Sequence, residues 1–345
     1  MKRMEIIKCH GSGNDFVMVD ITRECAWACA EDSMSVDGMA GMSAGMSGNG
    51  ASRISTEMSE RVDWSAFARA VSDRQRGIGS DGLLLVVRHD DGIYGMDMLN
   101  PDGTHAEMCG NGIRCVTRLA SERGYLDRGV LRSGGREYRV ARAADVAPSI
   151  PAFAVDIPIR LHSRDFAFFA PEERFVGRVI EALDDELRFT ALNLGNPHIV
   201  AAVEHIDMEL LEQLGERVKG LRELFPNGVN VSLYSRCAEN AIFVATYERG
   251  AGITLSCGTA MTASATAAAL LGIVEAGRRV RVDNRGGRVF CTTSLEPDIV
   301  TRLEGNATYE WIGEAEFTEG VLRYDITRPT DEAELWREFV ASLNR

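Results

Sequence analysis

The chain has 345 residues, of which 45% are hydrophobic and 26% charged, a composition typical of a folded protein large enough for two domains. Its 38 basic and 51 acidic residues give a net charge of −13, which argues against a nucleic-acid partner, because basic side chains would have to neutralise the phosphates. It contains neither an uninterrupted apolar run of about 18 residues nor a secretory apolar core near its start, so we expect a cytoplasmic protein that does not contact a membrane.

The first half of the chain predicts strands, loops and helices in turn. Apolar and β-branched runs predict strands over 4–8, 16–21, 83–87 and 93–99. Helices are expected from Trp64 to Arg74, behind an N-cap at Asp63, and over 111–123. The Met-, Gly- and Ser-rich segment 33–52 has no periodicity, so we expect an exposed insertion rather than a metal site, since Met alone is a poor set of ligands.

The second half continues the same mixture. Helices are expected over 172–183, over 208–219 behind Asp207, from Thr259 to Leu271, and in the tail from about residue 329. Strands are predicted over 153–157, 198–203, 229–234, 241–247, 279–283, 288–293 and 299–303. Because strands outnumber the helices between them, the sequence predicts a mixed α/β (α+β) fold.

A weak internal repeat relates the two halves. Gly-Asn loops at 13–14 and 195–196 are each followed by strands and then by a Cys-Gly-polar turn that opens a helix. These turns are Cys109-Gly110-Asn111 and Cys257-Gly258-Thr259. The repeat predicts two similar domains that face each other across a cleft.

The two cysteines at the helix starts suggest chemistry. The free N–H groups and the positive dipole end of a helix stabilise a thiolate, so the pKa of each of these two thiols is expected to lie below its usual value. The same N–H groups bind a carboxylate, and Gly110 and Gly258 leave room for it. Two such ends around one molecule would place a thiol on each face of a carbon, as proton abstraction with inversion requires. The alternative is a pair of buried structural cysteines, and the duplicated context argues against it.

Polar side chains in loops complete the candidate site. Four asparagines lie in turn-like contexts: Asn14, Asn100, Asn196 and Asn230. One such Asn usually bonds to its own loop, but these four recur around the cysteine turns together with Glu248 and Arg249. An Arg–Asn set binds a carboxylate, and Glu and Asn oxygens accept hydrogen bonds from an ammonium. His198 is either a loop histidine with satisfied hydrogen bonds or a neighbour of a thiol.

Six ordered blocks of sequence resemble the diaminopimelate epimerase family. They are CHGSGNDFVMVD (9–20), GIGSDG (77–82), NPDGTHAEMCGNGIRC (100–115), LGNPH (194–198), VNVSL (229–233) and ERGAGITLSCGT (248–259). The resemblance implies a cofactor-independent, homodimeric isomerase of two pseudo-symmetric domains, each a mixed sheet wrapped around a central helix. It also implies interconversion of LL- and meso-2,6-diaminoheptanedioate in lysine and peptidoglycan-precursor biosynthesis.

The same resemblance assigns a role to each candidate residue. Cys109 and Cys257 would be the two acid–base residues. The backbone N–H groups that would hold the reacting carboxylate belong to Gly110, Asn111, Gly258 and Thr259. Asn14 would lie beside the reacting amine, and the distal end of the substrate would be held by Asn100, Asn196, Asn230, Glu248 and Arg249. His198 would neighbour the catalytic pair, and neither a metal nor another cofactor is implied.

The sequence departs from the family in four places. Gly82 stands where the family has a glutamine, and Ala260-Met261-Thr262-Ala263 adds bulk behind Cys257. Residues 22–62 form an insertion and 313–345 an extended tail, and we expect both to be peripheral or to lie at an interface. The expected domains are 1–156 together with 306–345, and 157–305.

Two alternatives remain open. A racemase of the same fold acting on another amino acid would leave the distal polar set unpaired, although Gly82 favours it. A thiol redox protein would pair the two helix-start cysteines in a reversible disulfide. We expect all eight cysteines to be thiols that bind no metal, because none forms a C-x-x-C pair and Cys25-x-x-x-Cys29 has no partner pair. A dehydrogenase is excluded, because the loop at 11–15 lacks the third glycine of a dinucleotide site.

Overall fold

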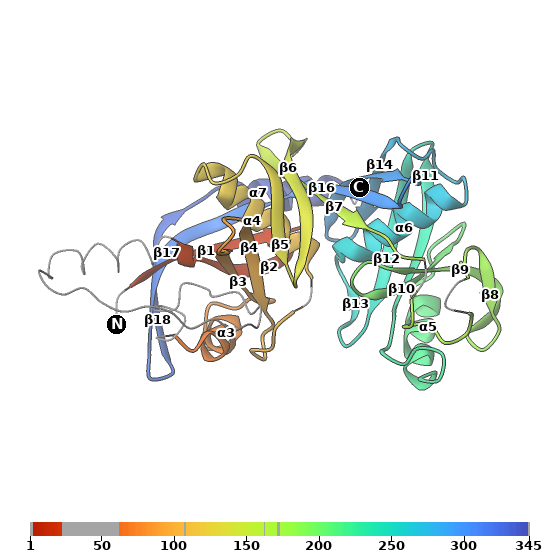
Figure 1. Ribbon diagram of the computed structural model, residues 1–345, viewed down its shortest axis with the longest axis horizontal. Helices are drawn as coiled ribbons and strands as arrows, with labels where there is room; N and C mark the ends of the chain where they lie inside the picture. Colours follow the sequence, from red (N-terminus) through yellow and green to blue (C-terminus); the bar gives the residue numbers. More distant parts are fainter. Residues whose placement is uncertain (1–2, 23–61, 107, 162, 171–172, 344–345) are drawn as a thin grey trace, which may run out of the picture.

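A computed structural model of the chain describes residues 3–22, 62–106, 108–161, 163–170 and 173–343 (Figure 1). The expected insertion at 33–52 and the pair Cys25 and Cys29 lie outside these residues. Within the described ranges, no helix is both long and apolar enough to cross a bilayer.

The first half of the chain supplies one set of strands with two helices. The strands are β1 (Met4–Gly11), β2 (Asn14–Asp20), β3 (Leu83–Arg88), β4 (Tyr94–Leu99), β5 (Arg128–Ser133), β6 (Arg136–Ala147) and β7 (Ile150–Pro158). The helices are α3 (Trp64–Ser72) and α4 (Gly110–Glu122). Asp63 caps α3 as predicted, because its Oδ1 accepts a hydrogen bond from the N–H of Ala66 at 2.9 Å.

The second half supplies a second set, and the chain then returns to the first. The strands of the second set are β8 (Arg178–Ile180), β9 (Asp184–Asn193), β10 (Pro197–Ala202), β11 (Asn230–Ala238), β12 (Ala241–Glu248), β13 (Gly252–Thr254), β14 (Arg279–Asn284), β15 (Gly287–Ser294) and β16 (Val300–Asn306). Its helices are α5 (Met208–Gly220) and α6 (Gly258–Leu270). Figure 1 shows the last elements beside the first set: β17 (Thr308–Thr318), β18 (Val321–Pro329) and α7 (Glu332–Leu343).

The strand pairing repeats between the two halves. From β1 to β7, successive strands pair antiparallel, parallel, antiparallel, parallel, antiparallel and antiparallel. The series β9, β10, β11, β12, β14, β15 and β16 follows the same order. In each series one helix follows the second strand and another precedes the fifth. This repetition confirms the predicted mixed α/β fold of two pseudo-symmetric units.

The two units share one continuous sheet. β7 and β16 pair antiparallel with each other, and in Figure 1 they run between the two lobes. The predicted domain boundaries, 156/157 and 305/306, fall within these two strands and stay a prediction.

Helices α4 and α6 lie at the centres of the two lobes. All residues of α4 from Gly110 to Ala120 are buried, and so are all residues of α6 from Gly258 to Ala269. Because both helices are buried on every face over these residues, the surrounding strands hold the ends of the two helices in fixed positions.

One predicted helix is wrong. Residues 172–183 were expected to be helical, but β8 occupies Arg178–Ile180 and a turn leads into β9. Gly177 has a φ of +62°, which a helix does not accommodate, and Ile180 and Leu183 pack into the core beneath the strands. The segment carries enough apolar residues for either structure, and tertiary packing decides between them.

Candidate active site

The start of α4 brings together Cys109, Asn14 and Asn111. Cys109 is the N-cap residue in an extended conformation, and its Sγ accepts a hydrogen bond from the N–H of Gly112 at 3.4 Å. Its thiol lies 3.7 Å from Oδ1 of Asn14, which also accepts a hydrogen bond from Nδ2 of Asn111 at 3.1 Å. The thiol therefore lies between the free N–H groups of a helix and a carboxamide oxygen.

The start of α6 repeats this arrangement with different neighbours. Cys257 is the N-cap residue, is buried, and has its Sγ 3.3 Å from Oγ1 of Thr259. The two helix starts meet, because a Cβ placed on Gly258 would lie 2.7 Å from Oδ1 of Asn111. That buried oxygen has no hydrogen-bond partner among the described residues. The structure thus brings the two predicted cysteine turns to one place, where an unpaired acceptor faces them.

Burial changes the acidity that the helix ends were expected to confer. It raises the pKa of Cys109 to about 11, although the N–H groups of Gly112 and Asn111 and the charge of Arg114 act in the opposite direction. Burial also raises the pKa of Cys257 well above its usual value, and the negative charge of Glu248 adds to this effect. The expectation of lowered pKa values is therefore wrong, because desolvation by burial outweighs the hydrogen bonds from the N–H groups at the helix starts.

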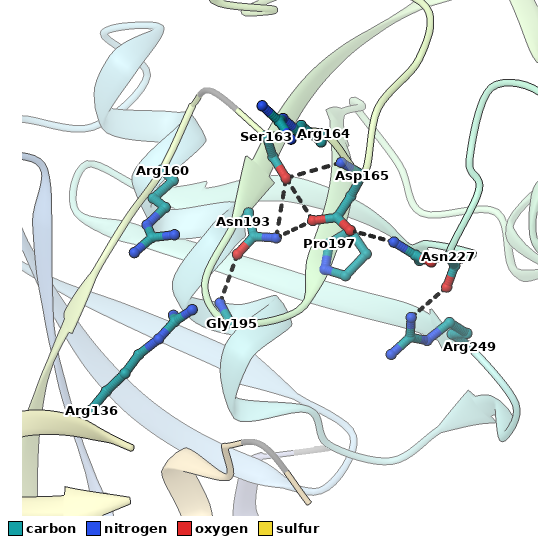
Figure 2. Close-up of a pocket in the computed structure, with 10 residues that line it drawn as sticks. All are labelled: Arg136, Arg160, Ser163, Arg164, Asp165, Asn193, Gly195, Pro197, Asn227 and Arg249. Atoms are coloured by element: carbon teal, nitrogen blue, oxygen red, sulfur yellow. Dashed lines mark hydrogen bonds between the residues drawn. The ribbon is translucent and has the colours of Figure 1, made fainter. Parts of the chain in front are cut away.

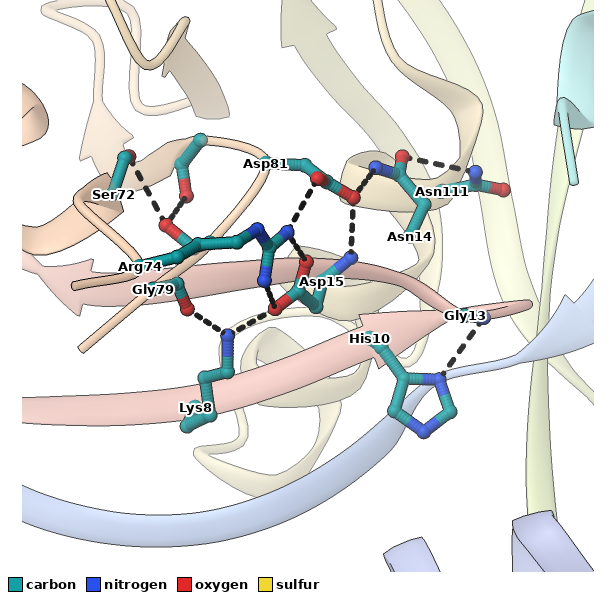
Figure 3. A network of polar contacts seen from close by, with 12 residues as sticks. Lys8, His10, Gly13, Asn14, Asp15, Ser72, Arg74, Gly79, Asp81 and Asn111 are labelled. Atoms are coloured by element: carbon teal, nitrogen blue, oxygen red, sulfur yellow. Dashed lines mark hydrogen bonds and ion pairs between the residues drawn. The ribbon is translucent and has the colours of Figure 1, made fainter. Parts of the chain in front are cut away.

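A network of charged side chains fixes the orientation of Asn14 (Figure 3). Nδ2 of Asn14 donates to Oδ2 of Asp81 at 2.7 Å, so its Oδ1 is turned toward Cys109. Arg74 bridges Asp81 and Asp15 at 2.7 and 2.8 Å, and the buried Lys8 pairs with Asp15. The sequence analysis missed Lys8, Arg74 and Asp81 as site residues, although Asp81 lies in the GIGSDG block.

Arg114 lies one turn into α4, fully buried behind the cysteine turn. Its guanidinium donates to the carbonyl oxygens of Asn306 and Gly110 at 3.2 and 3.4 Å and to Oγ of Ser12 at 3.2 Å. None of its partners in the described ranges is a carboxylate. An unneutralised cation therefore lies close to Cys109, and sequence reasoning missed it too.

Three of the distal residues form one chain of contacts with His198. Oδ1 of Asn196 lies 3.0 Å from Nε2 of His198, which is 3.4 Å from Nδ2 of Asn230, and Oδ1 of Asn230 accepts from the N–H of Arg249 at 2.8 Å. Nδ2 of Asn196 also lies 3.3 Å from Oγ1 of Thr259, which connects the chain to Cys257. Burial lowers the pKa of His198 to about 3, so this histidine is neutral.

Asn100 and Glu248 lie apart from that chain. Asn100 donates to Oγ1 of Thr104 at 3.0 Å, and Glu248 accepts from Oγ1 of Thr254 at 2.6 Å. Both line a cavity of about 1100 Å³ that also contains Asn14, whereas Arg249 lines a different cavity of about 720 Å³. The distal set is therefore not gathered in one cavity: Asn100 and Glu248 line the larger cavity, Arg249 lines the smaller one (Figure 2), and Asn196 and Asn230 are in the lining of neither.

The tail is part of the site. Trp336 and Arg337 of α7 line the larger cavity, and the ring of Trp336 lies 5.7 Å from that of His10. Glu332 binds Arg118 of α4 through both carboxylate oxygens, at 2.5 and 2.7 Å. The tail was expected to be peripheral or to lie at an interface; it is not peripheral, because α7 connects the larger cavity to the central helix of the first lobe, and the interface stays a prediction.

Close packing against strand β4 explains why position 82 holds a glycine. A Cβ at this position would lie 2.7 Å from the carbonyl oxygen of Leu99 and 3.1 Å from Cε of Met98. Any side chain would require the neighbouring strand β4 to move. A residue of glutamine size therefore does not fit at this place in the chain.

Comparison with known proteins assigns the chain to a family. Residues 43–136 and 190–310, more than half of the chain, match the family of diaminopimelate epimerase. The diaminopimelate epimerase of Clostridium acetobutylicum is 31% identical, over 93% of this chain and 86% of its own length, and that of Listeria innocua is 29% identical, over 100% and 98%.

Solved structures support the fold. A phenazine biosynthesis protein of the PhzF family from Bacillus anthracis aligns with a TM-score of 0.59 and 14% identity, over 92% of this chain and 100% of that chain. The sequence and the fold agree: the chain belongs to the diaminopimelate epimerase family and is an isomerase.

Proposed function

We propose that the enzyme interconverts LL- and meso-2,6-diaminoheptanedioate, in lysine and peptidoglycan-precursor biosynthesis, by moving a proton between Cys109 and Cys257. The observation that carries this proposal is the meeting of the two helix starts, with Gly258 directly against Asn111 and a cysteine as the N-cap residue of each helix. A carbon held at this junction would have a sulfur on each face.

The reaction needs one thiolate and one thiol. One thiolate takes the α-proton, the C–H electron pair passes into the adjacent carboxylate, and the opposite thiol returns a proton to the other face. The N–H groups of Gly110, Asn111, Gly258 and Thr259 would hold that carboxylate as its charge grows. The two sulfurs exchange protonation states in each turnover, so the enzyme returns to its resting form after the reverse reaction or by exchange with water.

Binding of the substrate would lower the raised pKa of the Cys109 thiol. Asn14 and the unpaired Oδ1 of Asn111 are acceptors for the α-ammonium, which would place a positive charge beside Cys109. A nearby cation favours the thiolate, whereas burial opposes it. The base would therefore form in the complex more readily than in the free enzyme.

The distal amino-acid end would meet the second polar set. Asn196, Asn230 and Arg249, with His198 behind them, offer donors for the distal carboxylate, while Asn100 and Glu248 offer acceptors for the distal ammonium. Asn100 and Glu248 line one cavity and Arg249 another, so a substrate held by all of them would draw these residues closer together.

The test uses the fully reduced enzyme with LL-diaminopimelate in D₂O. We expect loss of the α-proton signal in the NMR spectrum and appearance of the meso isomer, with no exchange in lysine, which lacks the distal carboxylate. A Cys109→Ala/Cys257→Ala double variant serves as the control. Absence of exchange in the wild-type enzyme would overturn the proposal, and equal exchange of lysine would move it to another amino acid.

The proposal includes a cytoplasmic homodimer. Val321, Tyr324 and Ile326 on β18 are 56, 41 and 52% exposed, and these apolar side chains support an interface that covers them. Light scattering should give the mass of a dimer for the wild type and of a monomer for Ile326→Glu. A monomeric wild type would refute the dimer.

A further inference from the structure

Helix α7 reaches the site through one buried side chain. Among the described residues of this helix only Trp336 is buried, with 4% of its surface exposed, and it belongs to the wall of the larger cavity. The start of the helix is anchored to the first lobe, because Glu332 binds Arg118 and accepts a hydrogen bond from the N–H of Tyr309 at 3.0 Å. The first lobe therefore holds the indole ring in place.

On one side the indole supports the loop that carries Asn14. Its centroid lies 5.7 Å from that of the His10 imidazole, close to the end of β1. Nδ1 of His10 accepts a hydrogen bond from the N–H of Gly13 at 3.3 Å (Figure 3), and burial lowers the pKa of His10 to about 4, so the ring stays neutral and can accept. Gly13 precedes Asn14, whose Oδ1 lies 3.7 Å from the thiol of Cys109. A short series of contacts thus connects the indole to the first cysteine turn.

On the other side the indole rests on the turn between β14 and β15. A Cβ added to Gly287 would lie 2.7 Å from Cη2 of Trp336, so only a glycine allows the ring to come this close. The preceding Gly286 donates its N–H to the carbonyl oxygen of Leu255 at 2.9 Å, and a Cβ there would lie 2.8 Å from Cβ of Ser256. Leu255 and Ser256 lie directly before the second cysteine turn, so this turn is connected to the indole as well.

The loop of the first lobe and the turn of the second are also in contact with each other. A Cβ on Gly286 would lie 3.1 Å from the carbonyl oxygen of Ser12, so the two backbones pack directly together. Gly286 and Gly287 have no side chains of their own to hold this contact. Removal of the indole would leave a void beside them, and a void in a packed region lets the surrounding backbone shift.

We propose that Trp336 is a positioning residue for proton transfer, which holds the loop at 10–14 and the turn at 284–287 so that the two cysteine turns keep the spacing that the reaction needs. This inference rests on the proposed function. A carbon that exchanges protons with two sulfurs is sensitive to their separation, and a displacement of about 1 Å can lower a rate by about 10²-fold. The indole acts through the two segments and itself neither takes nor supplies a proton.

The kinetic test compares three variants of the full chain with diaminopimelate as substrate. Trp336→Ala should lower kcat about tenfold and change KM by less than about twofold, because the groups that bind the substrate remain. Trp336→Phe keeps an aromatic ring beside Gly287 and should recover most of kcat. Glu338→Ala, on the exposed face of the same helix, is the matched control and should behave like the wild type. Thermal unfolding followed by circular dichroism verifies that each variant is folded during the assay.

Hydrogen exchange provides a readout that does not depend on the substrate. The N–H groups of Gly13 and Gly286 should exchange about tenfold faster in Trp336→Ala than in the wild type, because both segments lose the same support. Mass spectrometry of peptides that cover 10–16 and 284–289 measures this change. Peptides from β4 in the first lobe and β11 in the second should keep the exchange rates of the wild type.

The outcomes separate a positioning role from other roles of the indole. A raised KM with an unchanged kcat in Trp336→Ala would mean that the indole contacts the substrate, and would overturn the positioning role. Faster exchange throughout the protein, or unchanged exchange at either segment, would overturn it too. Absence of α-proton exchange in the wild type, together with the expected local change in hydrogen exchange, would overturn the proposed function alone, because the support of both segments by the indole would still be observed.

Discussion

The two cysteine turns share a backbone but not an electrostatic environment. Cys109 and Cys257 have nearly the same dihedral angles, φ −142° and ψ 106° against φ −127° and ψ 109°, and each opens a buried helix. Five residues further on, α4 has the buried cation Arg114 and α6 has Thr262, whose hydroxyl donates to the carbonyl oxygen of Gly258 at 2.8 Å.

The difference in charge is reflected in the acidity of the two thiols. Arg114 lowers the pKa of Cys109 against the effect of burial, whereas Glu248 adds to burial in raising the pKa of Cys257. The two lobes thus hold the same kind of group next to opposite charges: the Cys109 thiol is near the positive Arg114, and the Cys257 thiol is near the negative Glu248.

The largest effect should come from the thiols themselves. Serine at either position should lower kcat/KM by about 10³-fold, because each turnover uses both groups for proton transfer. Steady-state assays of Cys109→Ser and Cys257→Ser give the values, and Cys237→Ser, at an exposed cysteine, is the control. A variant that keeps substantial activity would show that only one turn does the chemistry.

Removing the cation of α4 should make the two turns more alike in charge. Arg114→Met should raise the pKa of Cys109, shift the alkaline rise of kcat/KM to higher pH and lower its value at pH 8 about tenfold, whereas Arg114→Lys should restore most of it. Thr262→Ser is the matched change in α6 and should leave the pH profile alone. Equal losses without a shifted profile would mean that Arg114 only supports the fold.

Asn14 should lose its orientation when Asp81 is replaced. An amide in Asp81→Asn can donate as well as accept, so Oδ1 of Asn14 would no longer be turned toward Cys109 alone. We expect kcat to fall about fivefold, with a smaller change in KM. Asp91→Asn, at an exposed ion pair of the same lobe, is the control. A change confined to KM would contradict a positioning role.

The second lobe should lose stability in acid through His198. Its pKa is about 3 in the folded protein against 6.5 for the free side chain, so the unfolded state binds the proton first. Stability therefore falls as the pH drops from 6.5 toward 3, by about 2 kcal/mol at pH 5 from this residue. Urea titrations at pH 7 and 5 should show a smaller difference in His198→Asn than in the wild type.

Exposed His205 provides the matched control, since His205→Asn should keep the wild-type difference. If His198→Asn retained the full acid destabilisation, groups elsewhere would be responsible. His10 of the first lobe, whose pKa burial lowers to about 4, would then be the next residue to replace.

Sequence patterns predicted the parts of the fold that local chemistry decides. The Cys-Gly-polar turns, the Asp63 and Asp207 caps and the apolar strands β3 and β4 were all predictable, because each depends on a few neighbouring residues. The strands β6 and β18 were not predicted. In β6 charged residues interrupt the apolar positions, and in β18 the alternation of Leu322, Tyr324 and Ile326 was overlooked, although nearly every residue of this strand is exposed.

The site residues were predictable where they lie in the sequence blocks that resemble the family. Contacts between segments that are far apart in the sequence were not predictable. Asp81 is 67 residues from Asn14, and Arg114 is 102 residues from Ser12, so no spacing rule connects them. Both lie inside blocks that resemble the family, and charged side chains within such blocks were the available signal. α7, which forms part of the cavity wall, lies outside these blocks, so no sequence signal indicated its place in the site.

The most direct test of the two-thiol account is the isotopic composition of early products. Reduced enzyme is mixed with LL-diaminopimelate in D₂O, and the reaction is stopped after a few per cent of conversion. We predict that the meso product carries deuterium at the inverted carbon while the recovered LL substrate still carries hydrogen, because one sulfur removes the proton and the other delivers a deuteron. Retention of the original hydrogen in the product would mean that a single group takes and returns the proton, and would contradict the account.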